Sequence, residues 1–210
     1  MKIAVVGAAG MVGSRVVAEA AHRGHEPLAV YRTGRPAGLP SGVVAERGDA
    51  DDRRRMSELF GGVDAVVGAT RAATGREHTV AASTTALLDA AAASGVRILL
   101  VGGAAPLWHP RDPGRLVLDS PEYVPESIRD VAGASAAQLA VCRAHPADWV
   151  YLSPPALLGP GQRTGTYRRG TTTLVADLAG SSRISAEDLA VAVLDELENA
   201  GDERHFTVGY

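Results

Sequence analysis

Apolar residues in this chain form short runs, separated by stretches in which they recur at helical spacing. The first run, Lys2 to Val6, ends at a glycine, and Val12, Val16 and Ala20 then repeat with helical periodicity until Gly24. The beginning of the chain is therefore predicted to be a strand, a glycine turn and a helix.

The same alternation continues along most of the chain. The run from Val96 to Val101 is almost entirely apolar, as is typical of a parallel strand that is covered on both faces. Strands that alternate with helices at this spacing indicate a doubly wound α/β domain with a parallel sheet, that is, a Rossmann fold. The further predicted strands are 28–31, 43–46, 65–67, 96–101 and 149–152, and the predicted helices are 53–60, 76–94 and 125–144.

The last third has a different character. It is rich in Thr, Gly and Ser up to Ser185, which is predicted to cap a helix with Leu189, Val193 and Leu197 on one face. The final "HFTVGY" is predicted to be a closing strand. Because no linker or change of composition marks a boundary, we expect residues 1–210 to form one domain, with a small C-terminal cover over the cleft of the sheet.

Composition narrows the classes of partner. The formal net charge is −3 and basic residues are scattered, so neither nucleic acid nor a membrane surface is an expected partner. The single cysteine, Cys142, lies in an apolar helical pattern and is predicted to be a buried thiol, which fits a cytoplasmic location. The His, Asp and Glu residues do not have metal-ligand spacing, so no metal is expected.

Three glycines follow the first predicted strand at intervals of three: Gly7, Gly10 and Gly13. A glycine turn between a strand and a helix lets the backbone approach a pyrophosphate, whose charge is stabilised by the amides and the dipole of the helix N-terminus. The position at the front of a βαβ unit favours a dinucleotide site over the alternative of a tight turn with close helix packing.

The end of the second strand indicates which dinucleotide is bound. An acidic residue there holds the ribose hydroxyls of NAD, whereas arginine accommodates the additional phosphate of NADP. In "AVYRTGRP", Arg32 occupies this place with Arg35 nearby and no acidic residue between them. NADPH is therefore favoured over NADH, and the alternative is that both arginines are solvated loop charges.

Several segments resemble the atypical short-chain dehydrogenase/reductases, specifically the small NAD(P)H-binding group that includes NADH-flavin reductase-like and NmrA-like proteins. They are "VVGAAGMVGSRVV", "YRTGRP", "RGDADD", "ILLVGGAAPL", "WVYLSPPALLGPGQRTGTYR" and "SRISAEDLAVAVLDELE". The resemblance implies that Gly7, Ala9, Met11 and Val12 contact the pyrophosphate, Arg32 the 2′-phosphate, Asp49 the adenine, Ala69 and Thr70 the ribose, and Gly102, Gly103, Ser153 and Pro154 the nicotinamide.

The chain departs from that family in its acid–base residues. Most short-chain reductases carry a Tyr-x-x-x-Lys pair on the helix after the fifth strand, but the matching places here are Arg129 and Gly133, and Lys2 is the only lysine. The usual serine at the end of the fifth strand is replaced by Gly102 and Gly103. A hydride donor without a dedicated acid suits acceptors that need little proton assistance, such as oxidised flavins and quinones.

If a proton donor is used, it should lie near the carboxyl ends of the strands. His109, Tyr123, Ser153 and Tyr167 are the candidates, the first because imidazole titrates near neutral pH. The alternatives are that His109 is an ordinary loop histidine, that the Tyr123 ring anchors its loop, and that Ser153 orients an acceptor oxygen rather than donating a proton.

Three functions remain open from the sequence. The first is an NAD(P)H-dependent reductase of a small planar acceptor, such as a flavin or quinone. The second is a specific reductase or isomerase of a secondary-metabolite pathway, and the third is a non-catalytic sensor of NADP(H). The sequence leaves open whether the protein is a monomer or a homodimer.

Overall fold

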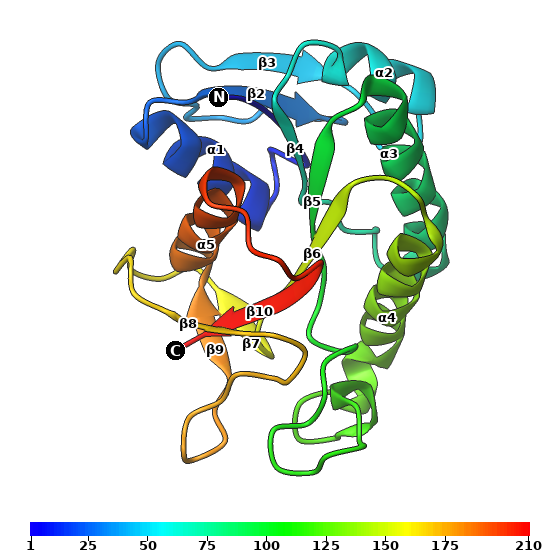
Figure 1. The fold of residues 1–210 in the computed structure, drawn as a ribbon, viewed down its shortest axis with the longest axis vertical. Coiled ribbons are helices and arrows are strands. Elements are labelled where there is room, and N and C mark those ends of the chain that lie inside the picture. Colours follow the sequence, from blue (N-terminus) through cyan, green and yellow to red (C-terminus); the bar gives the residue numbers. More distant parts are fainter.

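One large sheet organises the chain in the computed structural model, which describes residues 1–210 (Figure 1). Its eight strands lie in the order β3-β2-β1-β4-β5-β6-β10-β8, and only β8 runs antiparallel to its neighbour. A separate parallel pair is formed by β7 (Leu157–Gly159) and β9 (Arg183–Ser185). The strands of the large sheet are β1 (Lys2–Val6), β2 (Glu26–Tyr31), β3 (Val44–Arg47), β4 (Ala65–Gly68), β5 (Arg97–Val101), β6 (Trp149–Ser153), β8 (Arg168–Gly170) and β10 (His205–Gly209).

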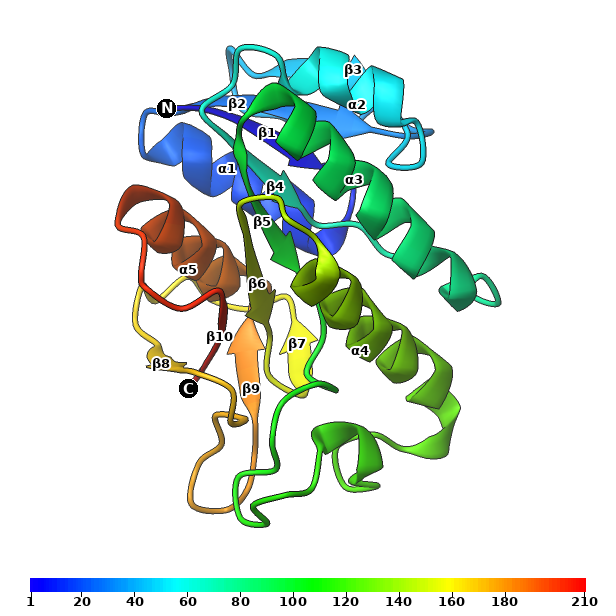
Figure 2. The ribbon, with the colours of Figure 1, turned by 45° about the vertical axis from the view of Figure 1, so that its right-hand side comes forward.

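Helices cover both faces of this sheet (Figures 1 and 2). On one face lie α1 (Met11–His22) and α5 (Ala186–Glu198). On the other face lie α2 (Arg53–Phe60), α3 (Val80–Ser94) and α4 (Arg129–Ala144). This arrangement confirms the predicted doubly wound α/β fold.

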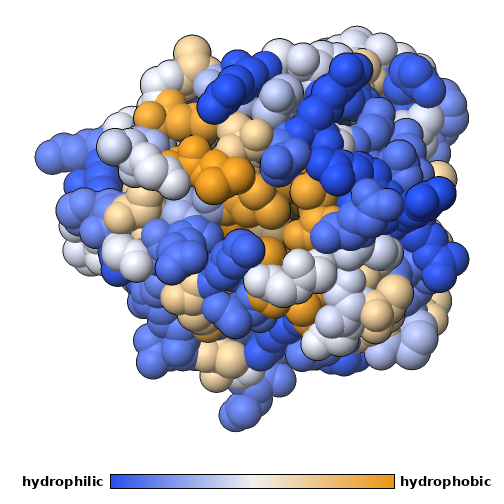
Figure 3. Space-filling view, turned by 90° about the horizontal axis from the view of Figure 1, so that it is seen from above, coloured by the Kyte–Doolittle hydropathy of each residue, from blue (hydrophilic) through white to orange (hydrophobic).

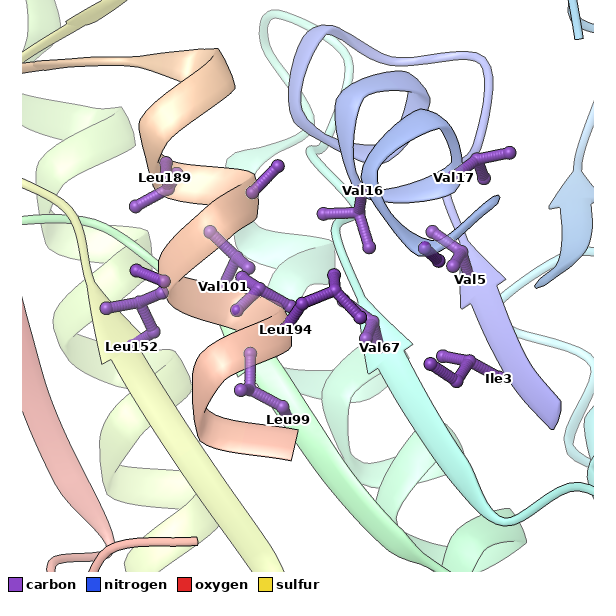
Figure 4. Close-up of a cluster of buried hydrophobic side chains, with 14 of the residues drawn as sticks. Ile3, Val5, Val16, Val17, Val67, Leu99, Val101, Leu152, Leu189 and Leu194 are labelled. Carbon is purple, nitrogen blue, oxygen red and sulfur yellow. The ribbon is translucent and has the colours of Figure 1, made fainter. Parts of the chain in front are cut away.

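Alternate residues of the central strands supply two separate cores. Ile3 and Val5 of β1 belong to the cluster beneath α1 and α5 (Figure 4), whereas Ala4 and Val6 belong to the cluster beneath α2, α3 and α4. All four residues are buried. The absence of polar alternation in these strands is explained because side chains on both faces enter a core.

A third, smaller core lies beside the carboxyl ends of β5 and β6. In it, Leu107 from the long connection between β5 and α4 packs with Leu174 from the segment after β8. Residues 102–128 and 171–182 therefore form one cover. The sequence predicted a cover made by the C-terminal portion alone, and the structure shows that the β5–α4 connection packs with part of that portion.

The elements differ from the sequence-based predictions mainly at their ends. The helices predicted at 76–94 and 125–144 begin as α-helices only at Val80 and Arg129, each preceded by a short 3₁₀ turn. Strands β7, β8 and β9 were not predicted, because three-residue strands carry too few positions to show a period. The closing strand β10 lies inside the large sheet, between β6 and β8.

Apolar side chains gather within a hydrophilic surface on the face seen in Figure 3. A cleft of about 660 Å³ is lined by residues from the starts of β1, β2 and β3, among them Leu28, Val43 and Val44.

No helix combines the length and apolar composition needed to cross a membrane. The side chains of His, Cys, Asp and Glu form no group of three or more that could hold a metal ion.

Candidate dinucleotide site

The carboxyl ends of β1 and β4 lie side by side at the centre of the sheet, where the strand order reverses. The connection after β1 leads to β2 on one side, whereas the connection after β4 leads to β5 on the other. In open α/β sheets, ligands bind in the crevice that such a reversal creates. The predicted residues Gly7 and Ala69 stand at this point, one after each strand.

Two glycines of the first loop are required by the packing of the loop itself. Gly7 has φ of +91°, and a Cβ atom there would lie 2.4 Å from the Ala69 carbonyl oxygen. A Cβ atom on Gly13 would lie 2.2 Å from the Gly7 carbonyl oxygen. A side chain at either position would push α1 or β4 away from the loop. Close packing therefore explains why these two positions are glycines.

The amino end of α1 leaves backbone donors free. Gly10 is the N-cap residue and has no side chain to accept a hydrogen bond. The backbone N–H groups of Met11, Val12 and Gly13 have no acceptor within the protein, and neither does that of Ala9. An uncapped helix N-terminus at a switch point fits a diphosphate, because it supplies both donors and a favourable dipole.

Arginines lie at the end of β2, as predicted. The side chains of Arg32 and Arg35 are exposed and form no ion pair or hydrogen bond with the protein. The half-buried Asp49 follows β3, and its carboxylate accepts a hydrogen bond from the backbone N–H of Asp51 (3.2 Å). These positions place the two guanidinium groups and the carboxylate on the β2–β3 side of the crevice.

At the other side of the crevice, Gly102 and Gly103 follow β5 and lie against Tyr151. A Cβ atom on Gly102 would lie 1.8 Å from the Tyr151 hydroxyl oxygen, so this glycine makes room for the tyrosine. The buried Tyr151 hydroxyl donates to the Ser135 carbonyl (3.0 Å) and the Gln138 side chain (3.1 Å) of α4. Burial raises the pKa of Tyr151 above its ordinary value, so the ring stays neutral.

Sequence reasoning missed the role of Tyr151. The sequence predicts it only as a residue of the strand at 149–152. The available signal was Gly102 directly after the adjacent strand β5, because a glycine at a strand end marks a place that another part of the chain approaches closely.

Ser153 is fully buried at the end of β6 and does not open onto the crevice. Its hydroxyl lies 2.9 Å from Nε2 of His205, which is the first residue of β10. Burial lowers the pKa of His205 to about 4, so this imidazole is neutral at pH 7. An acceptor would need a local movement of the chain to reach the Ser153 hydroxyl, and the following Pro154 is buried as well.

His109 and Tyr123 are both engaged inside the cover. Nε2 of His109 lies 3.0 Å from Glu122, its Nδ1 accepts a hydrogen bond from the Arg111 backbone N–H, and the residue is only 8% exposed. The Tyr123 hydroxyl donates to the Gly180 carbonyl (3.0 Å), and burial raises the pKa of Tyr123. The interpretation of Tyr123 as a loop anchor matches this geometry, and His109 is a buried hydrogen-bonded residue of its loop.

The "RTGTY" segment ties the C-terminal third to two helices. Arg163 donates two hydrogen bonds to Glu19 of α1, at 2.7 and 2.8 Å. The Tyr167 hydroxyl donates to Asp195 of α5 (2.6 Å), which together with burial raises the pKa of the phenol. Tyr167 is therefore a structural residue in this arrangement, and nothing in the local sequence pattern indicated partners so distant in the chain.

Comparison with known proteins agrees with this geometry. The fold and the glycine loop define a Rossmann-type NAD(P)-binding protein. The family described as NAD(P)H-binding matches residues 7–200, and the chain belongs to it. It is also 33% identical over 201 residues to the uncharacterized protein YwnB of Bacillus subtilis (strain 168). The matched region covers 95% of this chain and 93% of YwnB.

Solved structures of several bacterial proteins have the same fold as this chain. A putative epimerase from Bacteroides thetaiotaomicron is 35% identical, with a TM-score of 0.90 and coverage of 100% of this chain and 96% of that one. A putative NADH-flavin reductase from Streptococcus pneumoniae is 28% identical, with a TM-score of 0.86 and coverage of 100% and 99%. A putative exported protein from Burkholderia pseudomallei is 37% identical, with a TM-score of 0.88 and full coverage of both chains.

Proposed function

We propose that this protein is an NADPH-dependent reductase that transfers hydride to a planar, easily reduced acceptor such as a flavin or a quinone. The observation that carries the proposal is the uncapped N-terminus of α1 at the switch point, with its free backbone N–H groups beside Gly7. Membership of the NAD(P)H-binding family supports the cofactor, and the similar Streptococcus pneumoniae protein supports the acceptor class.

The preference for NADPH over NADH rests on Arg32 and Arg35. Both guanidinium groups are exposed and have no carboxylate partner, so their charge is free to pair with the 2′-phosphate that distinguishes NADPH. The β2 end has no acidic residue that would instead accept hydrogen bonds from the ribose hydroxyls of NAD.

The chain's own residues bind and orient the reactants. The free amides at the start of α1 bind the diphosphate, and the end of β5, where Gly102 and Gly103 make room for Tyr151 and Ser135, borders the nicotinamide. The buried Tyr151 packs against this end of β5 and is hydrogen-bonded to α4. When bound, NADPH supplies the hydride, and the protein contributes proximity and alignment.

The proposed site favours acceptors that do not need a proton from the protein, because its candidate proton donors are engaged or buried. Helix α4 carries neither tyrosine nor lysine. Both ring nitrogens of His109 are engaged, the Tyr123 hydroxyl donates to a backbone carbonyl, and the Ser153 hydroxyl is buried. A flavin or quinone can take its proton from water after hydride transfer, whereas an isolated ketone gains far more from a positioned acid.

Purified protein should oxidise NADPH in the presence of a flavin or quinone from a panel of FMN, FAD, riboflavin and naphthoquinones. The negative control is Gly10→Asp, which places a carboxylate where the diphosphate is proposed to bind and should abolish turnover. Its Cβ atom would lie 3.2 Å from the Gly7 carbonyl oxygen, so circular dichroism checks that the variant is folded. NADPH that binds but is never oxidised by any acceptor would contradict the reductase proposal.

A second candidate is a sensor of NADP(H) without catalytic activity. It is favoured by the same engagement of His109, Tyr123 and Ser153, which leaves the predicted nicotinamide end without a free acid or base. The acceptor panel separates the two candidates, because a sensor binds NADPH without oxidising it.

A further inference from the structure

Three arginines at or after the carboxyl ends of β2 and β3 have no acidic partner. Arg32 and Arg35 follow β2, and Arg47 is the last residue of β3, paired in register with Tyr31. None of the three guanidinium groups forms an ion pair. Arg47 was not predicted from the sequence to bind phosphate, because it directly follows the strand predicted at 43–46 and does not lie in the loop after β2.

The Arg47 side chain is hydrogen-bonded to the backbone of Arg32. Its Nε donates a hydrogen bond to the Arg32 carbonyl oxygen (3.2 Å), while its two terminal amino groups have no partner in the protein. The residue is exposed, and its own carbonyl accepts a hydrogen bond from Nε of Arg55 (3.2 Å). The guanidinium group is therefore held at the end of β2 with the donors of its outer edge free.

The neighbouring charges make this arrangement distinct. Every arginine on the adjacent helix α2 is matched with a carboxylate, so the lack of a partner at Arg47 is not a general property of this region. The pairs are Arg53 with Asp89 (3.5 Å), Arg54 with Glu58 (3.3 Å) and Arg55 with Glu46 (2.9 Å).

The acidic residues that follow β3 are also occupied. Asp49 accepts from the backbone N–H of Asp51, Asp51 is hydrogen-bonded to Ser83, and Asp52 caps α2 by accepting from the Arg55 backbone N–H (2.9 Å). The positive charge of Arg47 is thus left uncompensated beside Arg32. Such a guanidinium can bind a phosphate through two parallel hydrogen bonds.

The geometry points to Arg47 as a third arginine of the 2′-phosphate site, in addition to Arg32 and Arg35. It binds the phosphate through its terminal amino groups and fixes the Arg32 backbone through Nε. This inference rests on the proposed NADPH preference and names a specificity residue for it.

The test compares 2′,5′-ADP with 5′-AMP by isothermal titration calorimetry, because the two ligands differ only in the 2′-phosphate. Arg47→Ala should weaken binding of 2′,5′-ADP about tenfold, the loss of one charge-assisted contact at an exposed site, and leave 5′-AMP unchanged. Arg47→Lys keeps the charge but loses the fork and the bond to Arg32, so its affinity should lie between those of Arg47→Ala and the wild type. Arg54→Ala is the matched control, since it removes an arginine whose side chain is 92% exposed on the adjacent helix.

The outcomes separate the role of Arg47 from the 2′-phosphate site and from the reductase proposal. Equal weakening of both ligands, or no change in either, would overturn the role of Arg47. If the wild type did not distinguish 2′,5′-ADP from 5′-AMP, the 2′-phosphate site itself would be refuted, together with the role of Arg47. A selective loss in Arg47→Ala without oxidation of NADPH by any acceptor would support Arg47 and refute only the reductase proposal.

Discussion

Glu19 of α1 offers a quantitative test of how the C-terminal third is held to the first helix. Its side chain is only 5% exposed and accepts hydrogen bonds from Arg163 at 2.7 and 2.8 Å and from Arg23 at 2.8 Å. The hydrogen bonds from Arg163, opposed by burial and reinforced by Arg23, lower the pKa of Glu19 from 4.5 to about 2. We expect Glu19→Gln to destabilise the protein.

The magnitude follows from the pKa. Each pKa unit corresponds to about 1.4 kcal/mol, so the shift from 4.5 to about 2 corresponds to about 3 kcal/mol at pH 7. The Arg163 side chain is 45% exposed, and solvent screening at that end reduces the expected loss to about 2 kcal/mol. Glu19→Gln should lower the free energy of unfolding by this amount.

The pH dependence has a definite sign. A carboxylate whose pKa is lowered in the folded state contributes stability that is complete above the unfolded pKa of 4.5 and is lost as pH falls toward about 2. The difference between wild type and Glu19→Gln should therefore be constant from pH 7 to about 5 and shrink at lower pH. Urea denaturation at pH 7, 5 and 3 measures it without adding salt.

Glu58→Gln is the control, because Glu58 is 49% exposed and its ion pairs with Arg54 and Arg55 lie on the surface of α2. That variant should lose less than about 0.5 kcal/mol. The reasoning about Glu19 is refuted if Glu19→Gln equals the wild type at pH 7, or if its deficit persists unchanged at pH 3.

Four further variants test three features of the candidate site. Gly10→Asp should weaken NADPH binding at least about tenfold by calorimetry, because its carboxylate caps α1 and repels the diphosphate. Gly10→Asn caps the helix without adding charge and should bind NADPH more tightly than Gly10→Asp. Equal affinities of the two variants would contradict the electrostatic argument. Arg32→Glu should lower the ratio of kcat/KM for NADPH over NADH at least about tenfold, and an unchanged ratio would refute its assignment. Gly102→Ala should cost about 1–3 kcal/mol in urea denaturation, because its Cβ meets the Tyr151 hydroxyl oxygen at 1.8 Å; unchanged stability would show that Tyr151 can move aside.

The sequence predicted the features that arise from local patterns. The run from Lys2 to Val6 and the helical spacing after it identified β1 and α1, because buried parallel strands are apolar on both faces. Gly7 and Gly13 were recognised from their spacing, although part of their role is to pack the loop against itself and against Ala69. The sequence also predicted that Arg32 follows β2, where the structure places it.

The features that the sequence did not reveal depend on contacts between distant segments. Arg163 and Glu19 are separated by 144 positions, and no local period connects them. Ser153 was predicted to border the nicotinamide, but the pairing of β10 beside β6 brings His205 to its hydroxyl instead. The position of a strand within a sheet is set by the whole fold, so the partner of a strand-end side chain could not be derived from its own neighbours.

Several ion pairs join α1 and the residue after it to the C-terminal third, and these pairs bear on the cofactor site. Arg15 and Glu19 of α1, and Arg23 directly after it, each join the C-terminal third, through Glu187, Arg163 and Asp195 respectively. The amino end of that same helix presents the free amides to the crevice. Because a helix moves as a rigid unit, these contacts fix the direction of the amides as well as the attachment of the C-terminal third. Loosening them should therefore weaken diphosphate binding even though none of the three residues is proposed to touch the cofactor.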